Sequence, residues 1–148
     1  MADNGQLKAN LVLASRFENI EVAERVLRDL CQQAGLGNDD DYWLVTALRE
    51  ALANAIRHGN RQDPTLHVRV AYVVENTTVT ITVEDQGEGF DPKGIPDPTD
   101  PKNLLRPNGR GIFYMRQFMN RVDFSPAPDG GTAVRMVRDL AHIDTDPS

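Results

Sequence analysis

Two neighbouring segments of alternating apolar residues limit the choice of fold. Residues 66–74 and 78–85 each place apolar side chains at every second position, which is the period of a half-buried β-strand. Only a short turn at Glu75-Asn76 separates them. A turn of this length joins antiparallel strands, whereas parallel strands need a long crossover. The pair therefore excludes a doubly wound parallel fold and predicts a sheet that contains this hairpin.

Further strands and helices are expected on both sides of the hairpin. The same alternation predicts strands over residues 7–14, 120–125 and 132–138. Apolar residues at helical spacing predict helices from about Asn19 to Ala34, from Asn38 to Arg57 or His58, and from near Arg110 onward. The resulting order predicts an α+β fold, a two-layer α/β sandwich. In it a mixed, mostly antiparallel sheet is covered on one face by about three helices.

Length and composition predict a single cytoplasmic domain. The 148 residues suit one core, which we place in residues 1–140, with a frayed tail at 141–148. The net charge of −6 argues against nonspecific DNA binding, which depends on neutralising phosphates. Cys31 has no second cysteine to pair with, as expected in a reducing compartment. The chain shows no signal peptide and no apolar stretch of roughly 20 residues, so no membrane partner is expected.

Polar side chains recur along the second predicted helix. At about 100° per residue, Glu50, Asn54 and His58 lie on one stripe, and Arg57 joins it. Alanines beside the stripe would let another molecule approach the helix closely. An asparagine carbonyl oxygen is a hard ligand suited to Mg²⁺. The stripe is therefore either the solvated face of an amphipathic helix or a site that holds a metal and a proton acceptor.

Asp85 closes the second strand of the hairpin. It has the same parity as Val79, Ile81 and Val83, so its carboxylate points to the apolar side of the sheet. A carboxylate there is costly unless hydrogen-bond donors reach it. Either the strand has ended and Asp85 caps a turn, or the carboxylate accepts a planar amine such as that of adenine. The glycines of Asp85-Gln-Gly87-Glu-Gly89 favour a ligand, because they let the backbone approach one.

Residues 86–109 are rich in Gly, Pro and Asp and predict a long functional loop. The loop ends at Asn108-Gly109-Arg110-Gly111, directly before the third predicted helix. Free N–H groups at a helix start, approached through glycines, can bind an anion. Arg110 is therefore a candidate contact for a terminal phosphate. An ordinary surface arginine would give the same pattern.

Four of these segments together resemble the Bergerat-fold ATPases, the superfamily of gyrase B subunits, MutL and sensor histidine kinases. Residues 50–60 look like the N box, and residues 85–92 and 108–112 look like two glycine boxes. Gly130-Gly131-Thr132 matches the late threonine segment. They follow the family order over about residues 45–135. Within the superfamily, Glu-x-x-x-Asn-Ala-x-x-His-Gly is most similar to the anti-sigma-factor serine kinases.

The resemblance implies roles for the residues of the N box and the adenine end. Glu50 would be the general base, and Asn54 would bind Mg²⁺. Asp85 would hold the amine of adenine, and Thr132 would complete that site. His58 matches the motif without a chemical role that we can assign. Packing against the nucleotide or closing the helix fits it better than catalysis.

The resemblance also implies roles for the glycine boxes. Gly87 and Gly89 would be hinges of a lid over ATP. Asn108, Gly109 and Gly111 would lie at the phosphates. Two features depart from the family pattern: the second box has only one Gly-x-Gly, and the lid is rich in proline.

By resemblance, the chain would be a serine/threonine protein kinase that uses ATP and Mg²⁺. Its substrate would be a STAS-domain anti-anti-sigma protein, a sigma factor would be a second partner, and two copies would form a homodimer. Two alternatives stay open: a non-catalytic, ATP-gated binding module, and a detached catalytic domain of a sensor histidine kinase. The latter is less favoured, because no dimerisation helix pair is present and none of the three histidines precedes an acidic residue.

Overall fold

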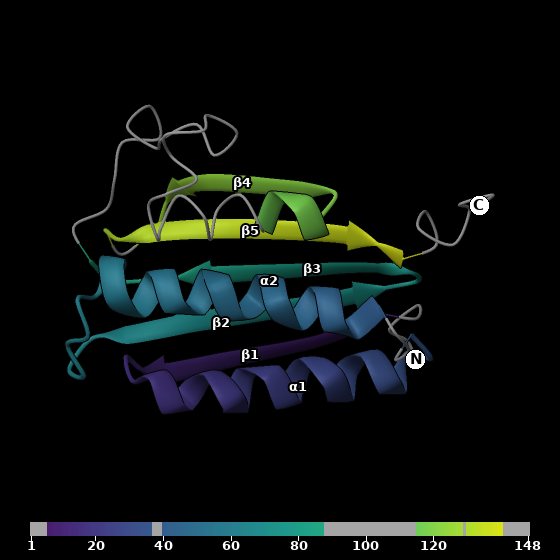
Figure 1. Cartoon of the computed structure of the whole chain (residues 1–148), viewed down its shortest axis with the longest axis horizontal. Helices are drawn as coiled ribbons and strands as arrows, with labels where there is room; N and C mark the ends of the chain where they lie inside the picture. Colours follow the sequence, from purple (N-terminus) through teal and green to yellow (C-terminus); the bar gives the residue numbers. More distant parts are fainter. Residues whose placement is uncertain (1–5, 37–39, 88–114, 129, 141–148) are drawn as a thin grey trace.

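One five-stranded sheet forms a layer of the molecule (Figure 1). The computed structural model describes residues 6–36, 40–87, 115–128 and 130–140. The strands are β1 Gln6–Ala14, β2 His67–Glu75, β3 Thr78–Glu84, β4 Arg121–Pro126 and β5 Thr132–Asp139, in the spatial order β1-β2-β3-β5-β4. All neighbouring pairs are antiparallel. The predicted hairpin is confirmed as β2–β3, and the sheet is wholly antiparallel rather than mixed.

Helices cover one face of this sheet (Figure 1), which confirms the two-layer α+β prediction. They are α1 Ile20–Gln33, which follows the 3₁₀ turn η1 Phe17–Asn19, then α2 Asp40–Asn54, and a helical segment at residues 115–118. As predicted, Gly35 closes α1: its φ is 76°, and the Leu36 N–H donates to the Cys31 carbonyl at 2.8 Å. None of the helices in the described ranges is long and apolar enough to cross a membrane.

The core lies between the helices and the sheet. Buried residues alternate with more exposed ones along β2 and β3, as the period of two requires. On α2, three leucines one turn apart are at most 1% exposed: Leu44, Leu48 and Leu52. Each such side chain contributes about 1.5–3 kcal/mol through burial. The Tyr72 hydroxyl donates to the Ala23 carbonyl at 2.8 Å, which ties β2 to α1, and burial raises the pKa of Tyr72.

The second helical segment ends at Gly59, as predicted, but its α-helical winding ends at Asn54. After Asn54 it continues as a π-helical turn, η2 Ala55–Gly59. There the Asn60 N–H donates to the Ala55 carbonyl, five residues earlier, at 2.8 Å. A constant step of about 100° per residue therefore holds only to Asn54. The wider turn ends at Gly59 and Asn60, both of which contact the segment that follows β3.

Candidate functional site

The end of the N box, residues 85–87 of the first glycine box and Thr132 meet at one end of the sheet. In Figure 1 the end of α2, the end of β3 and the start of β5 lie together at the left of the view. The pairing of Glu84 with Ala133 puts Asp85 opposite Thr132, and the Asp85 N–H donates to the Thr132 carbonyl at 2.9 Å. Antiparallel pairing of β3 with β5 thus joins segments that are 47 residues apart.

Asp85 is buried, as its parity on β3 predicts, and is 6% exposed. Its Oδ1 accepts hydrogen bonds from the backbone N–H groups of Gly87, at 3.0 Å, and Thr132, at 3.1 Å. The bond from Gly87 is the turn-capping contact that was one of the two predicted alternatives. Both of these donors go to Oδ1, while Oδ2 lies against Gly59. Among the described residues, capping the turn therefore engages only Oδ1 of the carboxylate.

Three glycines pack the backbone directly around this carboxylate. A Cβ added to Gly59 would overlap the Asp85 carboxylate, and one added to Gly131 would overlap the Asp85 carbonyl oxygen. A Cβ on Gly87 would overlap the Gly59 carbonyl oxygen. Only glycine permits such close approach. Gly59 and Gly131 were not predicted as site residues, because the sequence motifs contain them without indicating what they touch.

Asn60 and Ser15 also lie at this end of the sheet and were not predicted. They are 1% and 2% exposed, and the Asn60 Nδ2 donates to Ser15 Oγ at 2.7 Å. The Gln86 N–H donates to Asn60 Oδ1 at 2.8 Å. Asn60 directly follows the His-Gly of the N box, which is the sequence signal that could have drawn attention to it.

Burial raises the pKa of the Asp85 carboxyl, because desolvation disfavours the charged form. The N–H groups of Gly87 and Thr132 oppose this by stabilising the carboxylate. The net direction is upward, so the folded protein stabilises the charged form of this carboxyl less well than water does. A perturbed buried group of this kind is typical of a functional site.

The raised pKa of Asp85 predicts how stability depends on pH. A carboxyl with a folded pKa above its unfolded value stabilises the protein below the unfolded pKa and loses that contribution as pH rises through the folded pKa. The free energy of unfolding of Asp85→Asn, minus that of the wild type, should therefore rise from pH about 4 towards neutrality. Urea unfolding of both proteins without nucleotide measures this difference. A difference independent of pH would contradict the upward shift.

Gly131→Ala should destabilise the protein by about 3 kcal/mol, the upper end of overpacking costs, because its new Cβ meets a backbone oxygen that cannot rotate away. The matched control is Gly35→Ala, since a Cβ there meets nothing within 4 Å. Only the left-handed φ of Gly35 is penalised, at about 1–2 kcal/mol. Chemical denaturation compares the two variants. Equal losses in the free energy of unfolding would show that Gly131 is not in close contact with Asp85.

The polar stripe of α2 is arranged only partly as predicted. Glu50 and Asn54 are half-buried, and among the described residues neither side chain makes a hydrogen bond or ion pair. His58 is exposed, and Arg57 turns to the Phe17 ring, with 5.4 Å between the guanidinium carbon and the ring centroid. Partial desolvation of the imidazole and the positive charge of Arg57 both lower the pKa of His58. Within the described part of the chain, no side-chain bond thus engages Glu50 or Asn54, whereas Arg57 is used in packing.

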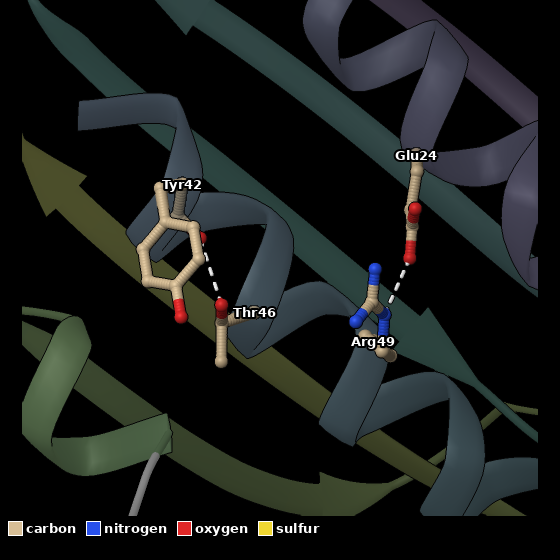
Figure 2. Close-up of polar contacts among 4 residues, drawn as sticks. All are labelled: Glu24, Tyr42, Thr46 and Arg49. Carbon is tan, nitrogen blue, oxygen red and sulfur yellow. Dashed lines mark hydrogen bonds and ion pairs between the residues drawn. The ribbon is translucent and has the colours of Figure 1, made fainter. Parts of the chain in front are cut away.

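The positive charge next to Glu50 in the chain is engaged elsewhere. Figure 2 shows the Arg49 guanidinium pointing to Glu24 of α1, with 2.7 Å between Arg49 Nε and Glu24 Oε2. Glu24 is buried, and its hydrogen bond raises the pKa of Arg49. In the preceding turns of α2, the Thr46 hydroxyl donates to the Tyr42 carbonyl at 2.8 Å (Figure 2). The ion pair fastens α2 to α1 without using the Glu50 carboxylate.

The remaining predicted site residues lie outside the described residues: Gly89, Asn108, Gly109, Arg110 and Gly111. The same holds for the tail at 141–148 and for the predicted lid beyond Gly87. Within the part of the chain that the structure describes, no group of three or more His, Cys, Asp or Glu could hold a metal ion.

Comparison with known proteins finds relatives in sequence and in fold. The anti-sigma F factor of Oceanobacillus iheyensis is 29% identical over 140 residues, covering 92% of this chain and 94% of that protein. The serine-protein kinase RsbW of Bacillus licheniformis is 30% identical over 130 residues, covering 83% and 79%. The crystal structure of the SiaB–SiaC complex from Pseudomonas aeruginosa contains a similar fold, with a TM-score of 0.67, 14% identity and 90% coverage of each chain.

Most of the chain also matches a defined protein family. Residues 13–138 match the family described as the histidine kinase-like ATPase domain. This range contains the N box, both glycine boxes and Thr132, so the match covers every predicted site residue. The chain belongs to the histidine kinase-like ATPase domain family.

Proposed function

We propose that the chain is an ATP-dependent serine/threonine protein kinase of the anti-sigma-factor type, with the nucleotide bound between Asp85 and α2. The observation that carries this proposal is the buried Asp85 carboxylate, whose Oδ1 is held by two backbone N–H groups while Oδ2 lies against Gly59. A carboxylate lined by glycine backbone suits a flat ligand with an amino group, such as adenine. Membership of an ATPase family supports ATP as that ligand.

The chemistry would take place along α2. Glu50 accepts the proton of a partner's hydroxyl while that oxygen bonds to the γ-phosphorus, and the bond to the β-phosphate oxygen breaks to release ADP. Asn54, four residues further along α2, would hold Mg²⁺, which would supply neutralisation of the phosphate charge. Arg110 and the amides around Gly109 and Gly111 are assigned to the phosphates on the sequence pattern alone. Positioning and electrostatics supply most of the catalysis.

The proposed partners follow from the names of the relatives and from the resemblance. A relative named serine-protein kinase supports transfer to a protein hydroxyl, and relatives named anti-sigma F factors support binding of a sigma factor. We assign the hydroxyl to a STAS-domain antagonist protein. The proposal places the chain in the cytoplasm and pairs two copies as a homodimer.

Radiolabelled ATP incubated with the chain, Mg²⁺ and candidate STAS-domain proteins tests the proposal. Label should appear on a serine or threonine of one of them, and the transfer should require the chain. If the chain binds ATP but transfers no label to any candidate, the kinase assignment is removed. A non-catalytic module whose partner surface responds to ATP would then be the better description.

Asn54→Ala should raise the Mg²⁺ concentration needed for half-maximal phosphotransfer by about tenfold, the effect of losing roughly 1.4 kcal/mol of binding. The side chain is half-buried and has no protein partner among the described residues, so its removal should leave the fold stable. Asn10→Ala, at an exposed position on β1, is the control and should leave the Mg²⁺ dependence unchanged. An unchanged requirement in Asn54→Ala would mean that another group binds the metal.

A further inference from the structure

We propose that Asn60 is a positioning residue that sets the orientation of the Asp85 carboxylate and thereby the preference for adenine over other purines. The inference rests on the proposed function, because it takes Asp85 to hold the adenine amine. It goes beyond that function by assigning the selectivity to a residue that touches neither the nucleotide nor the reacting atoms. The case rests on the partners of the Asn60 amide.

The Asn60 side chain is fully enclosed and uses both ends of its amide. It is 1% exposed. Its Nδ2 donates to Ser15 Oγ at 2.7 Å and to the His67 carbonyl at 2.9 Å, and its Oδ1 accepts the Gln86 N–H at 2.8 Å. Ser15 follows β1, His67 begins β2 and Gln86 lies just after β3. One amide therefore joins the ends of three strands.

Two of these connections bear directly on Asp85. Gln86 is the next residue in the chain, so its bond to Asn60 fixes the peptide that leaves Asp85. Gly59 precedes Asn60 and packs closely against the Asp85 carboxylate. Asn60 is thus connected to both backbone segments next to the carboxylate, to Gly59 through the chain and to Gln86 through a hydrogen bond. Displacing Gln86 would also move the Gly87 N–H, which donates to Asp85 Oδ1 at 3.0 Å.

The contacts of Gln86 and the backbone near Asn60 explain how a single amide can fix the position of the backbone around Asp85. The Gln86 Oε1 accepts the His67 N–H at 2.6 Å, so Gln86 is held at its backbone and at its side chain. Asn60 leaves the π-helical turn and is followed by Arg61 and Gln62, both with positive φ, at 53° and 59°. Such a backbone persists only when its surroundings hold it in place. The Asn60 side-chain bonds to Ser15 and His67 contribute to that hold, together with the Gln62 N–H bond to the Ile56 carbonyl at 2.7 Å.

A buried amide with three partners also stabilises the fold, so the test must separate stability from selectivity. Ser15→Ala is the matched control. Ser15 belongs to the same network and is equally buried, yet its contacts run to Asn60 Nδ2 and the Leu66 carbonyl rather than to Gln86. Losing its hydroxyl should weaken the network at the end away from Asp85. Asn60→Ala removes the bond to Gln86 as well.

The experiment measures dissociation constants for Mg-ATP and Mg-ITP, the inosine nucleotide that lacks the amine, together with the thermal midpoint of each variant. Wild type should prefer ATP, and Asp85→Asn should abolish that preference. Ser15→Ala and Asn60→Ala should both melt earlier. Only Asn60→Ala should reduce the ATP preference, by about tenfold, as expected for a poorly placed hydrogen bond worth roughly 1.4 kcal/mol. Asn60→Ser, a smaller substitution that keeps a polar group, gives the same test if Asn60→Ala does not fold.

An Asn60 variant that melts early but keeps the wild-type ATP preference would overturn the inference, because the residue would then be purely structural. A reduced preference in Ser15→Ala equal to that in Asn60→Ala would overturn it too. Failure of the proposed function looks different. If the wild type does not prefer Mg-ATP over Mg-ITP, or if Asp85→Asn keeps that preference, Asp85 does not bind the adenine amine. The role proposed for Asn60 is then excluded as well.

Discussion

Asp85→Asn should weaken Mg-ATP binding by about 100-fold while the protein stays folded. The Asn Oδ1 can still accept the N–H groups of Gly87 and Thr132, so the turn after β3 is retained. The new Nδ2 then takes the place of Oδ2 and presents donors where the adenine amine needs an acceptor. Losing a charge-assisted hydrogen bond and leaving a donor unpaired costs about 1.5–3 kcal/mol, which corresponds to roughly 10-fold to 150-fold in affinity.

The matched control for this variant is Glu84→Gln. Glu84 precedes Asp85 at the end of β3, and its side chain has the opposite parity, away from the helices. Nucleotide affinity, measured by thermal stabilisation over a range of Mg-ATP concentrations, should be unchanged in Glu84→Gln. Strong binding by Asp85→Asn would show that the nucleotide does not use this carboxylate. Equal losses in both variants would point to a general effect of charge.

Glu50→Gln should lower kcat for phosphotransfer by about 10²–10⁴-fold, the usual contribution of a general base. The substitution keeps the size and polarity of a half-buried side chain that makes no hydrogen bond or ion pair among the described residues. The ion pair of Arg49 with Glu24 should also survive, because it does not involve Glu50. The melting temperature and the ATP dissociation constant should therefore stay close to those of the wild type.

Single-turnover transfer to the STAS-domain partner gives this rate, and Glu21→Gln, at an exposed position on α1, is the control. Full activity in Glu50→Gln would assign the proton to another acceptor. If ATP changes partner binding equally in the wild type and in Glu50→Gln, the chain is instead the non-catalytic module. The pair of measurements thus separates chemistry from gating.

Local periodicity was sufficient to predict the layers of the fold. Alternation over residues 66–74 and 78–85 predicted β2 and β3, and the parity of Asp85 predicted its burial. Both signals are local: in a strand, the side of the sheet that a residue faces depends only on its position in the alternation. The cap at Gly35 was predicted for a similar reason, because a left-handed residue that ends a helix favours glycine.

The contacts around Asp85 could not be predicted, because they join segments that are distant in sequence. Asn60 bonds to Ser15 across 45 residues and to Gln86 across 26. A π-helical turn brings Gly59 to the carboxylate, and the apolar pattern does not predict it. Ala55 and Ile56 are buried in this turn, as they would also be in an α-helix. Motif resemblance indicated which segments meet, and only the folded chain shows which atoms touch.

A crystal structure of the chain with Mg²⁺ and a non-hydrolysable ATP analogue would test the central claim most directly. The adenine amine should lie within hydrogen-bond distance of the Asp85 carboxylate, and the metal should be bound to the Asn54 side-chain oxygen. Nucleotide bound elsewhere, or bound here with adenine away from Asp85, would contradict the account.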